Sequence, residues 1–170
     1  MILGMSLATF TLVHVAISLV GIAAGFVVLY GFFTSKRLPG WTTTFLATTI
    51  LTDITGYFFA FTKVLPSHIV GAISLVILAV AVAALYIYRL ADSWRWIYIA
   101  ASVAALYLNV FVGVVQAFLK IPFLHELAPT QSDPVFIVTQ AVVMVAFVAI
   151  GILASRSFHP AAEGRRFASA

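Results

Sequence analysis

Long apolar stretches constrain this chain more than any other feature of its sequence. Five of them follow one another, each close to the about 20 residues that an α-helix needs to cross a bilayer. Hydrophobic residues make up 64% of the 170 residues and charged residues only 8%, so a water-soluble fold could not cover this surface with polar groups. We therefore predict an all-α integral membrane bundle of five transmembrane helices, over residues 7–33, 41–62, 68–90, 94–119 and 135–155.

These spans form one predicted domain, residues 1–156, followed by a flexible cytoplasmic tail over 157–170. The first apolar run carries no charged side chain before Leu7, so it is typical of a retained span and not of a cleaved signal. The one substantial loop, 120–134, contains three prolines and several apolar residues. Their spacing predicts a short amphipathic turn or interfacial helix that packs over the end of the bundle.

Basic residues next to the spans predict the orientation. Seven fall on one side and two on the other, which favours an N-terminus outside and a C-terminus in the cytoplasm of a bacterial inner membrane. Tryptophan and tyrosine residues flank the same side, as in an interfacial aromatic belt. The seven are Lys36, Arg37, Arg89, Arg95, Arg156, Arg165 and Arg166, the two are Lys63 and Lys120, and the belt comprises Trp41, Trp94, Trp96, Tyr30, Tyr88 and Tyr98.

Composition also excludes several classes of function. The net charge of +4 is spread over short loops, so no basic patch indicates a nucleic-acid partner, and the expected partners are the lipid bilayer and other membrane subunits. The chain has no cysteine, which excludes disulfides, thiolate metal sites and thiol nucleophiles. No paired carboxylates, phosphate-binding glycine loop or Ser/His/Asp pattern is present, so the sequence favours a protein that is not an enzyme.

Four of the five predicted helices carry one stripe of small or polar residues at helical spacing. Small residues in such a stripe let helices approach closely, and polar side chains bridge helices inside a bundle, which is a sufficient interpretation for the glycines, Ser18, Thr49 and Ser102. The stripes comprise His14, Ser18, Gly21 and Gly25; Thr49, Asp53, Gly56 and Ala60; Ser102, Ala105, Asn109, Gly113 and Gln116; and Gln140, Met144, Phe147 and Gly151.

Asp53 has two open interpretations. It lies roughly 14 Å from the outer end of its span, where a carboxyl group costs about 3 kcal/mol and should face the interior. It is either a structural group hydrogen-bonded to Asn109 or a group that accepts a proton or binds a cation. In both cases we expect it to line an outward-opening polar pocket with His14, near Gln116 and Gln140.

Three histidines raise the alternative of a bound cofactor. A haem b held by His14 and His68 is one hypothesis, although their depths differ by roughly 7 Å. A copper or zinc site from His14, His68 and His125, with Met1 or Met5, is another. A small proton- or cation-coupled permease using Asp53 is a third. The interpretation that we place first is a non-catalytic accessory or binding subunit with a polar pocket in its outer half.

Two segments carry a resemblance to known sequences. Leu106-Tyr107-Leu108-Asn109-Val110-Phe111-Val112, followed by Leu127-Ala128-Pro129-Thr130-Gln131-Ser132, resembles small polytopic membrane proteins of bacteria. The resemblance extends over most of the spans and implies a bacterial inner membrane. It implies no activity, and no functional residue follows from it.

Overall fold

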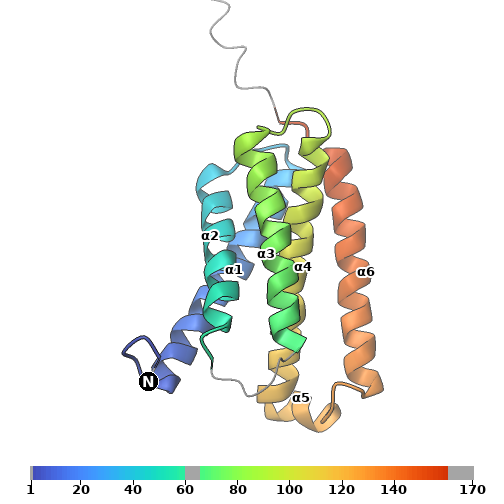
Figure 1. Cartoon of the computed structure of the whole chain (residues 1–170). Coiled ribbons are helices and arrows are strands. Elements are labelled where there is room, and N and C mark those ends of the chain that lie inside the picture. Colours follow the sequence, from blue (N-terminus) through green and yellow to red (C-terminus); the bar gives the residue numbers. More distant parts are fainter. Residues whose placement is uncertain (1, 60–65, 161–170) are drawn as a thin grey trace, which may run out of the picture.

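The computed structural model describes residues 2–59 and 66–160. These residues form α-helices, one π-helical turn and connections, with no strand among them, so the predicted all-α fold is confirmed. The helices run roughly parallel or antiparallel as a bundle (Figure 1). They are α1 (Leu7–Phe33), α2 (Pro39–Gly56), α3 (Pro66–Val82), the π-helical turn η1 (Ala83–Ile87), α4 (Trp94–Lys120), α5 (Pro122–Leu127) and α6 (Pro134–Ser157).

Four helices are long and apolar enough to cross a membrane. They are α1, α3 continued through η1, α4 and α6, with mean hydropathies of 2.5, 2.7, 2.0 and 2.6. These four correspond to the first, third, fourth and fifth predicted spans. The remaining long helix, α2, differs in composition because seven of its 18 residues are threonine.

The largest difference from the predicted bounds is at the end of α2. The second span is predicted over 41–62, whereas α2 ends at Gly56 and the backbone N–H groups of Tyr57 and Phe58 bond to carbonyls three residues back. Glycine is a poor helix former, and this tightening is typical of a helix end. Residues 60–62 of that prediction lie outside the described residues. Inside the 120–134 loop, α5 forms the predicted short helix.

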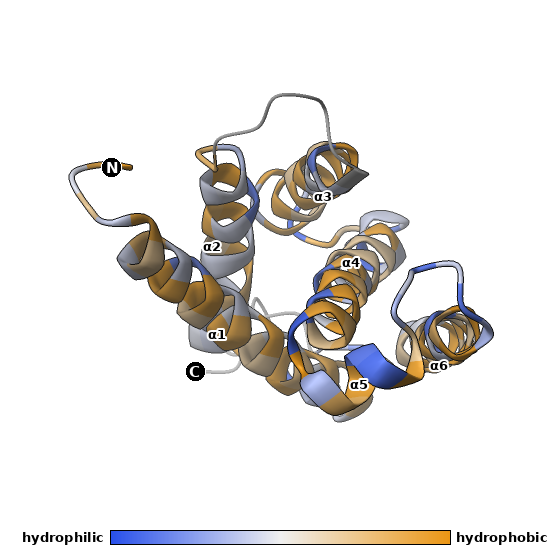
Figure 2. Cartoon of the chain, turned by 90° about the horizontal axis from the view of Figure 1, so that it is seen from below, coloured by the Kyte–Doolittle hydropathy of each residue, from blue (hydrophilic) through white to orange (hydrophobic). Residues whose placement is uncertain are grey.

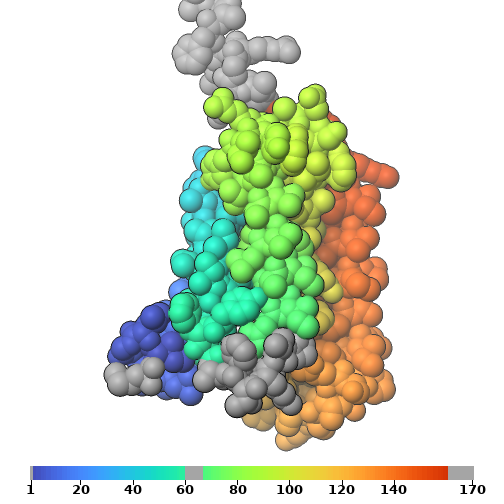
Figure 3. Space-filling view, viewed as in Figure 1, coloured from blue at the N-terminus to red at the C-terminus, as the bar shows by residue number. Residues whose placement is uncertain are grey.

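The helices are arranged around α4. It contacts α3, α1 and α6, while α2 lies between α1 and α3 (Figure 2). Along the flank of the bundle that α6 forms (Figure 3), a row of its valines is exposed, as expected for a surface that faces lipid. The loop containing α5 packs through Leu124 and Ala128 against Phe118 and Phe136. It therefore covers part of the bundle end where α4 ends and α6 begins.

A glycine pair permits the closest helix approach. A Cβ atom on Gly25 would lie 2.5 Å from Cδ1 of Leu106 and 3.1 Å from Cδ2 of Phe45, and one on Gly21 would lie 3.0 Å from Oγ1 of Thr48. No side chain fits at Gly25 without moving these neighbours. The packing interpretation of this pair is thus confirmed, since it seats α1 on α2 and α4.

The end of α6 is tied to the first connection. The Ser35 hydroxyl donates a 2.6 Å hydrogen bond to the carbonyl of Ser157, and the Arg95 guanidinium group donates to the carbonyl of Phe158. The Phe158 ring is 1% exposed and packs edge-on against Phe32, with ring centroids 5.0 Å apart. The first residues after the predicted last span are therefore packed into the bundle.

Candidate functional site

The polar side chains of the bundle centre on α2. Three of its seven threonine hydroxyls bond within the helix: Thr44 donates to the carbonyl of Gly40 at 3.0 Å, Thr48 to that of Thr44 at 2.7 Å, and Thr55 to that of Leu51 at 2.6 Å. Such back-bonding removes the need for a partner on another helix. Of the other polar groups of α2, Thr43 contacts Tyr86 of η1, Thr49 contacts Asn109 of α4, and Thr52 and Asp53 each have a buried oxygen without a partner among the described residues.

Thr49 connects α2 to α4. It is completely buried, and its hydroxyl accepts a 3.1 Å hydrogen bond from Nδ2 of Asn109. One of the two interpretations of Asp53 is a structural group hydrogen-bonded to Asn109. The structure instead pairs the Asn109 amide with Thr49, one helical turn before Asp53. This contact bridges two helices, which is the role expected of a buried Asn–Thr pair in a bundle.

Asp53 lies at the contact between α2 and α3. The hydroxyl of Ser74, a residue of α3 that is 2% exposed, donates a hydrogen bond to the Asp53 carboxyl group. The second carboxyl oxygen, Oδ2, is buried and has no hydrogen-bond partner among the described residues. Leaving such an atom unsatisfied costs about 1–3 kcal/mol, and more if it is charged. The carboxyl group therefore retains one unused and buried binding position.

His14 contacts a different face of α2. Its Nδ1 forms a 2.8 Å hydrogen bond with Oγ1 of Thr55, and its ring packs edge-on against Phe59, with ring centroids 5.2 Å apart. Positions 53 and 55 point about 200° apart around a helix. His14 also lies near Gly56, with its Cε1 3.9 Å from the position of a Cβ atom there, and no described hydrogen bond or ring contact joins His14 to Asp53.

The histidines are also separated from one another. His68 belongs to α3, and its ring lies 5.6 Å from that of Tyr57, whose hydroxyl donates to the His68 carbonyl at 2.7 Å. His125 is exposed on α5. Within residues 2–59 and 66–160, no three His, Asp or Glu side chains are placed to hold a metal ion. No described contact joins His14 to His68, and the haem b hypothesis stays a prediction.

The two glutamines have separate environments. Gln140 of α6 is buried, and its Nε2 donates a 3.1 Å hydrogen bond to the carbonyl of Phe111 of α4, while its Oε1 has no partner among the described residues. Gln116 is exposed on α4. Gln140 thus fastens α6 to α4, and neither glutamine contacts Asp53 through a hydrogen bond that the structure describes.

One feature was missed by the sequence analysis. A cavity of about 230 Å³ lies at the Arg37 end of the bundle, between α1, α2, η1, α4 and the end of α6. Tyr98, predicted to belong to the aromatic belt, is 2% exposed and lines this cavity instead. The lining residues come from separate elements with no common spacing, so no pattern in the sequence indicates that they meet.

Comparison of the chain with protein-family models, with curated proteins and with solved structures gives no match.

Proposed function

We propose that this chain is a five-span protein of the bacterial inner membrane, with its N-terminus outside and its C-terminus in the cytoplasm. The fifth span is α2, which is about 27 Å long at 1.5 Å per residue and packs between α1 and α3. The first connection, the α3–α4 connection and the end of α6 meet at one bundle end (Figure 1), and they contain the basic residues that favour a cytoplasmic location.

A reporter experiment tests this orientation. A reporter that is active only in the periplasm should be silent when fused after Ala170 and active when inserted between Ala128 and Asp133. If α2 lies outside the bilayer, the number of crossings becomes even, so a reporter at the N-terminus gives the same result as the one fused after Ala170.

Within this bundle we propose a non-catalytic binding subunit that takes up a proton at Asp53. The observation that carries the proposal is the buried Oδ2 atom, which has no hydrogen-bond partner among the described residues and lies in a carboxyl group beside the neutral Ser74. An ionised carboxyl group in such surroundings is costly, and binding a proton is the simplest way to remove that cost. The sequence contains no paired carboxylates and no Ser/His/Asp pattern, which supports binding over catalysis.

A proton-coupled permease is the second candidate, favoured by the same carboxyl group. In that case the proton on Asp53 exchanges with both sides of the membrane, whereas in an accessory subunit it exchanges with one side or with a partner.

The experiment compares Asp53→Asn with Asp92→Asn, a matched carboxyl-to-amide change in the α3–α4 connection. We expect the infrared spectrum of the reconstituted wild type to contain a pH-dependent band of a protonated carboxyl group. Asp53→Asn should remove this band, and Asp92→Asn should leave it intact. A band that persists in Asp53→Asn contradicts the proposal, and proton flux into liposomes that requires Asp53 selects the permease.

A further inference from the structure

Asp53 lies close to one end of α2. Gly56, at which the helix ends, is three positions further along, or about 4.5 Å at 1.5 Å per residue. The last carbonyl groups of a helix are not used within it and are commonly satisfied by water. α5 lies at the same end of the bundle (Figure 1), which we call the α5 end. The Asp53 carboxyl group is therefore less than one helical turn from the end of its own helix.

Packed side chains close the opposite direction along α2. Between Asp53 and the Arg37 end, Phe45 and Leu46 of α2 belong to the same core cluster as Leu78 and Ala81 of α3, and all four are at most 4% exposed. A protein core is packed as densely as an organic crystal. Water can therefore cross this part of the bundle only if the helices move apart.

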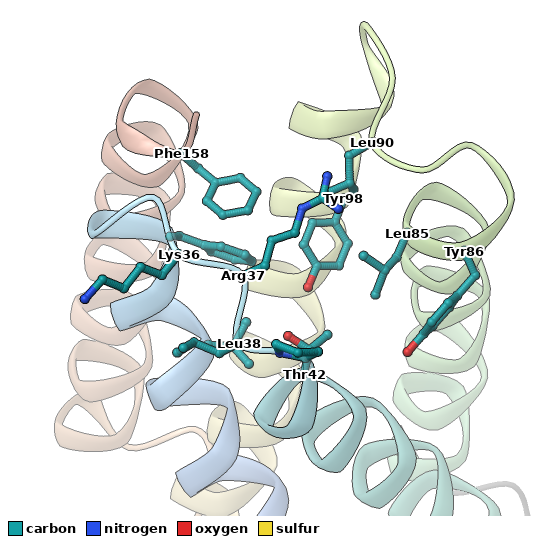
Figure 4. Close-up of a pocket in the computed structure, with 12 residues that line it drawn as sticks. Lys36, Arg37, Leu38, Thr42, Leu85, Tyr86, Leu90, Tyr98 and Phe158 are labelled. Carbon is teal, nitrogen blue, oxygen red and sulfur yellow. The ribbon is translucent and has the colours of Figure 1, made fainter. Parts of the chain in front are cut away.

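The cavity at the Arg37 end does not shorten this direction. Thr42, labelled in Figure 4, is the residue farthest along α2 that lines it. Thr42 lies 11 positions before Asp53, which is about 16 Å at 1.5 Å per residue. The cavity therefore ends well short of the Asp53 carboxyl group.

The ring of Tyr57 covers the short direction. Tyr57 directly follows α2, about one helical turn after Asp53. Its hydroxyl donates a 2.7 Å hydrogen bond to the carbonyl of His68, in the first turn of α3. Its ring lies against Gly71, where a Cβ atom would be 3.4 Å from Oη and 3.6 Å from Cε2 of Tyr57. Gly71 is about one turn before Ser74, so on both helices the ring lies directly outside the Asp53–Ser74 contact.

This ring is easier to move than the core on the other side. Tyr57 is 37% exposed and has one described hydrogen bond, so it can turn away from Gly71 by breaking that bond. Rotation of a partly exposed side chain is far faster than collective movement of packed helices. Among the described residues, the other titratable side chains near this end of α2 are His68 of α3, His14 of α1 and Lys120 at the end of α4.

We infer that Asp53 exchanges its proton only with the α5 end, and that Tyr57 controls this exchange. The inference rests on the proton uptake proposed above. When the ring turns away from Gly71, water reaches the Oδ2 atom. An O–H bond then forms on the carboxyl group as one breaks in hydronium, and the reverse step returns the proton to the same side. In the proposed orientation that side is the periplasm, and exchange with one side favours the binding subunit over the permease.

The rate of carboxyl exchange tests the role of Tyr57. The infrared band of protonated Asp53 is followed after rapid mixing of the purified full chain with D₂O, which shifts the band to lower wavenumber. Tyr57→Phe loses the hydrogen bond to the His68 carbonyl and should raise the exchange rate about two- to tenfold. Tyr57→Ala should raise it at least as much. Phe58→Ala, the matched truncation of a neighbouring ring that is 47% exposed, should leave the rate unchanged.

The side of exchange is tested in proteoliposomes. Because the chain has no cysteine, Ser132→Cys, at an exposed position between α5 and α6, provides a single labelling site. A membrane-impermeant maleimide then gives the fraction of molecules whose α5 end faces outward. The pH is changed only outside the vesicles. In preparations of different labelled fraction, the fraction of the Asp53 band that responds should equal the labelled fraction.

The outcomes distinguish this inference from the proton uptake itself. A wild type without a protonated Asp53 band refutes both. Control by Tyr57 is overturned, while the uptake stands, if both Tyr57 variants exchange at the wild-type rate, if Phe58→Ala accelerates exchange equally, or if the wild type exchanges fully within the mixing time. A response of the unlabelled fraction overturns access from the α5 end, and a response of the whole band does so and selects the permease. If Tyr57→Ala does not fold, Tyr57→Phe decides by the same criteria.

Discussion

The two ends of this bundle contrast in how their polar residues are used. At one end, His14, His68 and His125 belong to three different helices, and the two that are partly buried contact neighbours on α2 or directly after it. At the other end, basic and hydroxyl side chains from separate elements surround one cavity, closed by the tied end of α6. The residue types that suggest cofactor binding are thus packing contacts, whereas residues that suggest only membrane orientation share a cavity.

Residue type is thus a weaker guide to a site than whether side chains from several elements meet at one place. A histidine on each of three helices forms no site unless the helices turn those faces toward one another. A cavity can form where short connections bring side chains from several elements to the same point. In this bundle the connections, and not the spans, provide most of that convergence.

The largest expected effect concerns the packing that closes the Arg37 end. Phe158→Ala removes a ring that is 1% exposed and should lower the free energy of unfolding by about 3–5 kcal/mol. Phe123→Ala on α5, at the other end, removes a ring that is 68% exposed and should change it by less than about 0.5 kcal/mol. Unfolding of both variants in detergent micelles measures the two values, and equal losses would remove the contrast between the ends.

An intermediate effect is expected at His14. His14→Phe keeps a ring against Phe59 but loses the hydrogen bond with Thr55, whose hydroxyl still donates to the carbonyl of Leu51 at 2.6 Å. Because that hydroxyl remains satisfied, the loss should be about 0.5–1.5 kcal/mol in the same unfolding measurement. An absorption spectrum with a haem band that this variant lacks would show instead that His14 is a ligand.

The smallest effect is expected at His125. His125→Ala changes an exposed side chain on α5 and should alter the free energy of unfolding by less than about 0.5 kcal/mol. Zinc or copper added to the wild type should stabilise it no more than it stabilises this variant, when both are followed by thermal unfolding. Metal-dependent stabilisation that His125→Ala removes would support the three-histidine hypothesis and assign metal binding to the α5 end of the bundle.

Local properties of the chain were predictable from its sequence. The long apolar helices follow from hydropathy, which each segment carries by itself, and the Gly21–Gly25 contact follows from their spacing on one face. The partners of Asp53 and Asn109 could not be derived, because they depend on how far each helix is rotated about its axis relative to its neighbours. A rotation of half a turn decides whether Asp53 meets α1 or Ser74 of α3.

The cavity could not be predicted for a further reason. Leu90 reaches it through a π-helical turn and left-handed residues that no hydrophobic period indicates, and Tyr98 reaches it from α4. In the sequence, the segment 68–90 reads as one continuous apolar helix, and Tyr98 resembles its interfacial neighbours. The position of Phe158 depends on hydrogen bonds between segments more than 60 residues apart, which spacing rules do not address.

The threonines of α2 have a consequence for biogenesis. In the proposed five-span arrangement, α2 can enter hydrocarbon without first finding partners on other helices, because several of its threonine hydroxyls bond to carbonyls of the same helix. Its Asp53, however, receives a hydrogen bond from Ser74, which is synthesised 21 residues later. During synthesis α2 should therefore remain beside the insertion machinery until α3 emerges, and the two helices should leave for the bilayer as a pair.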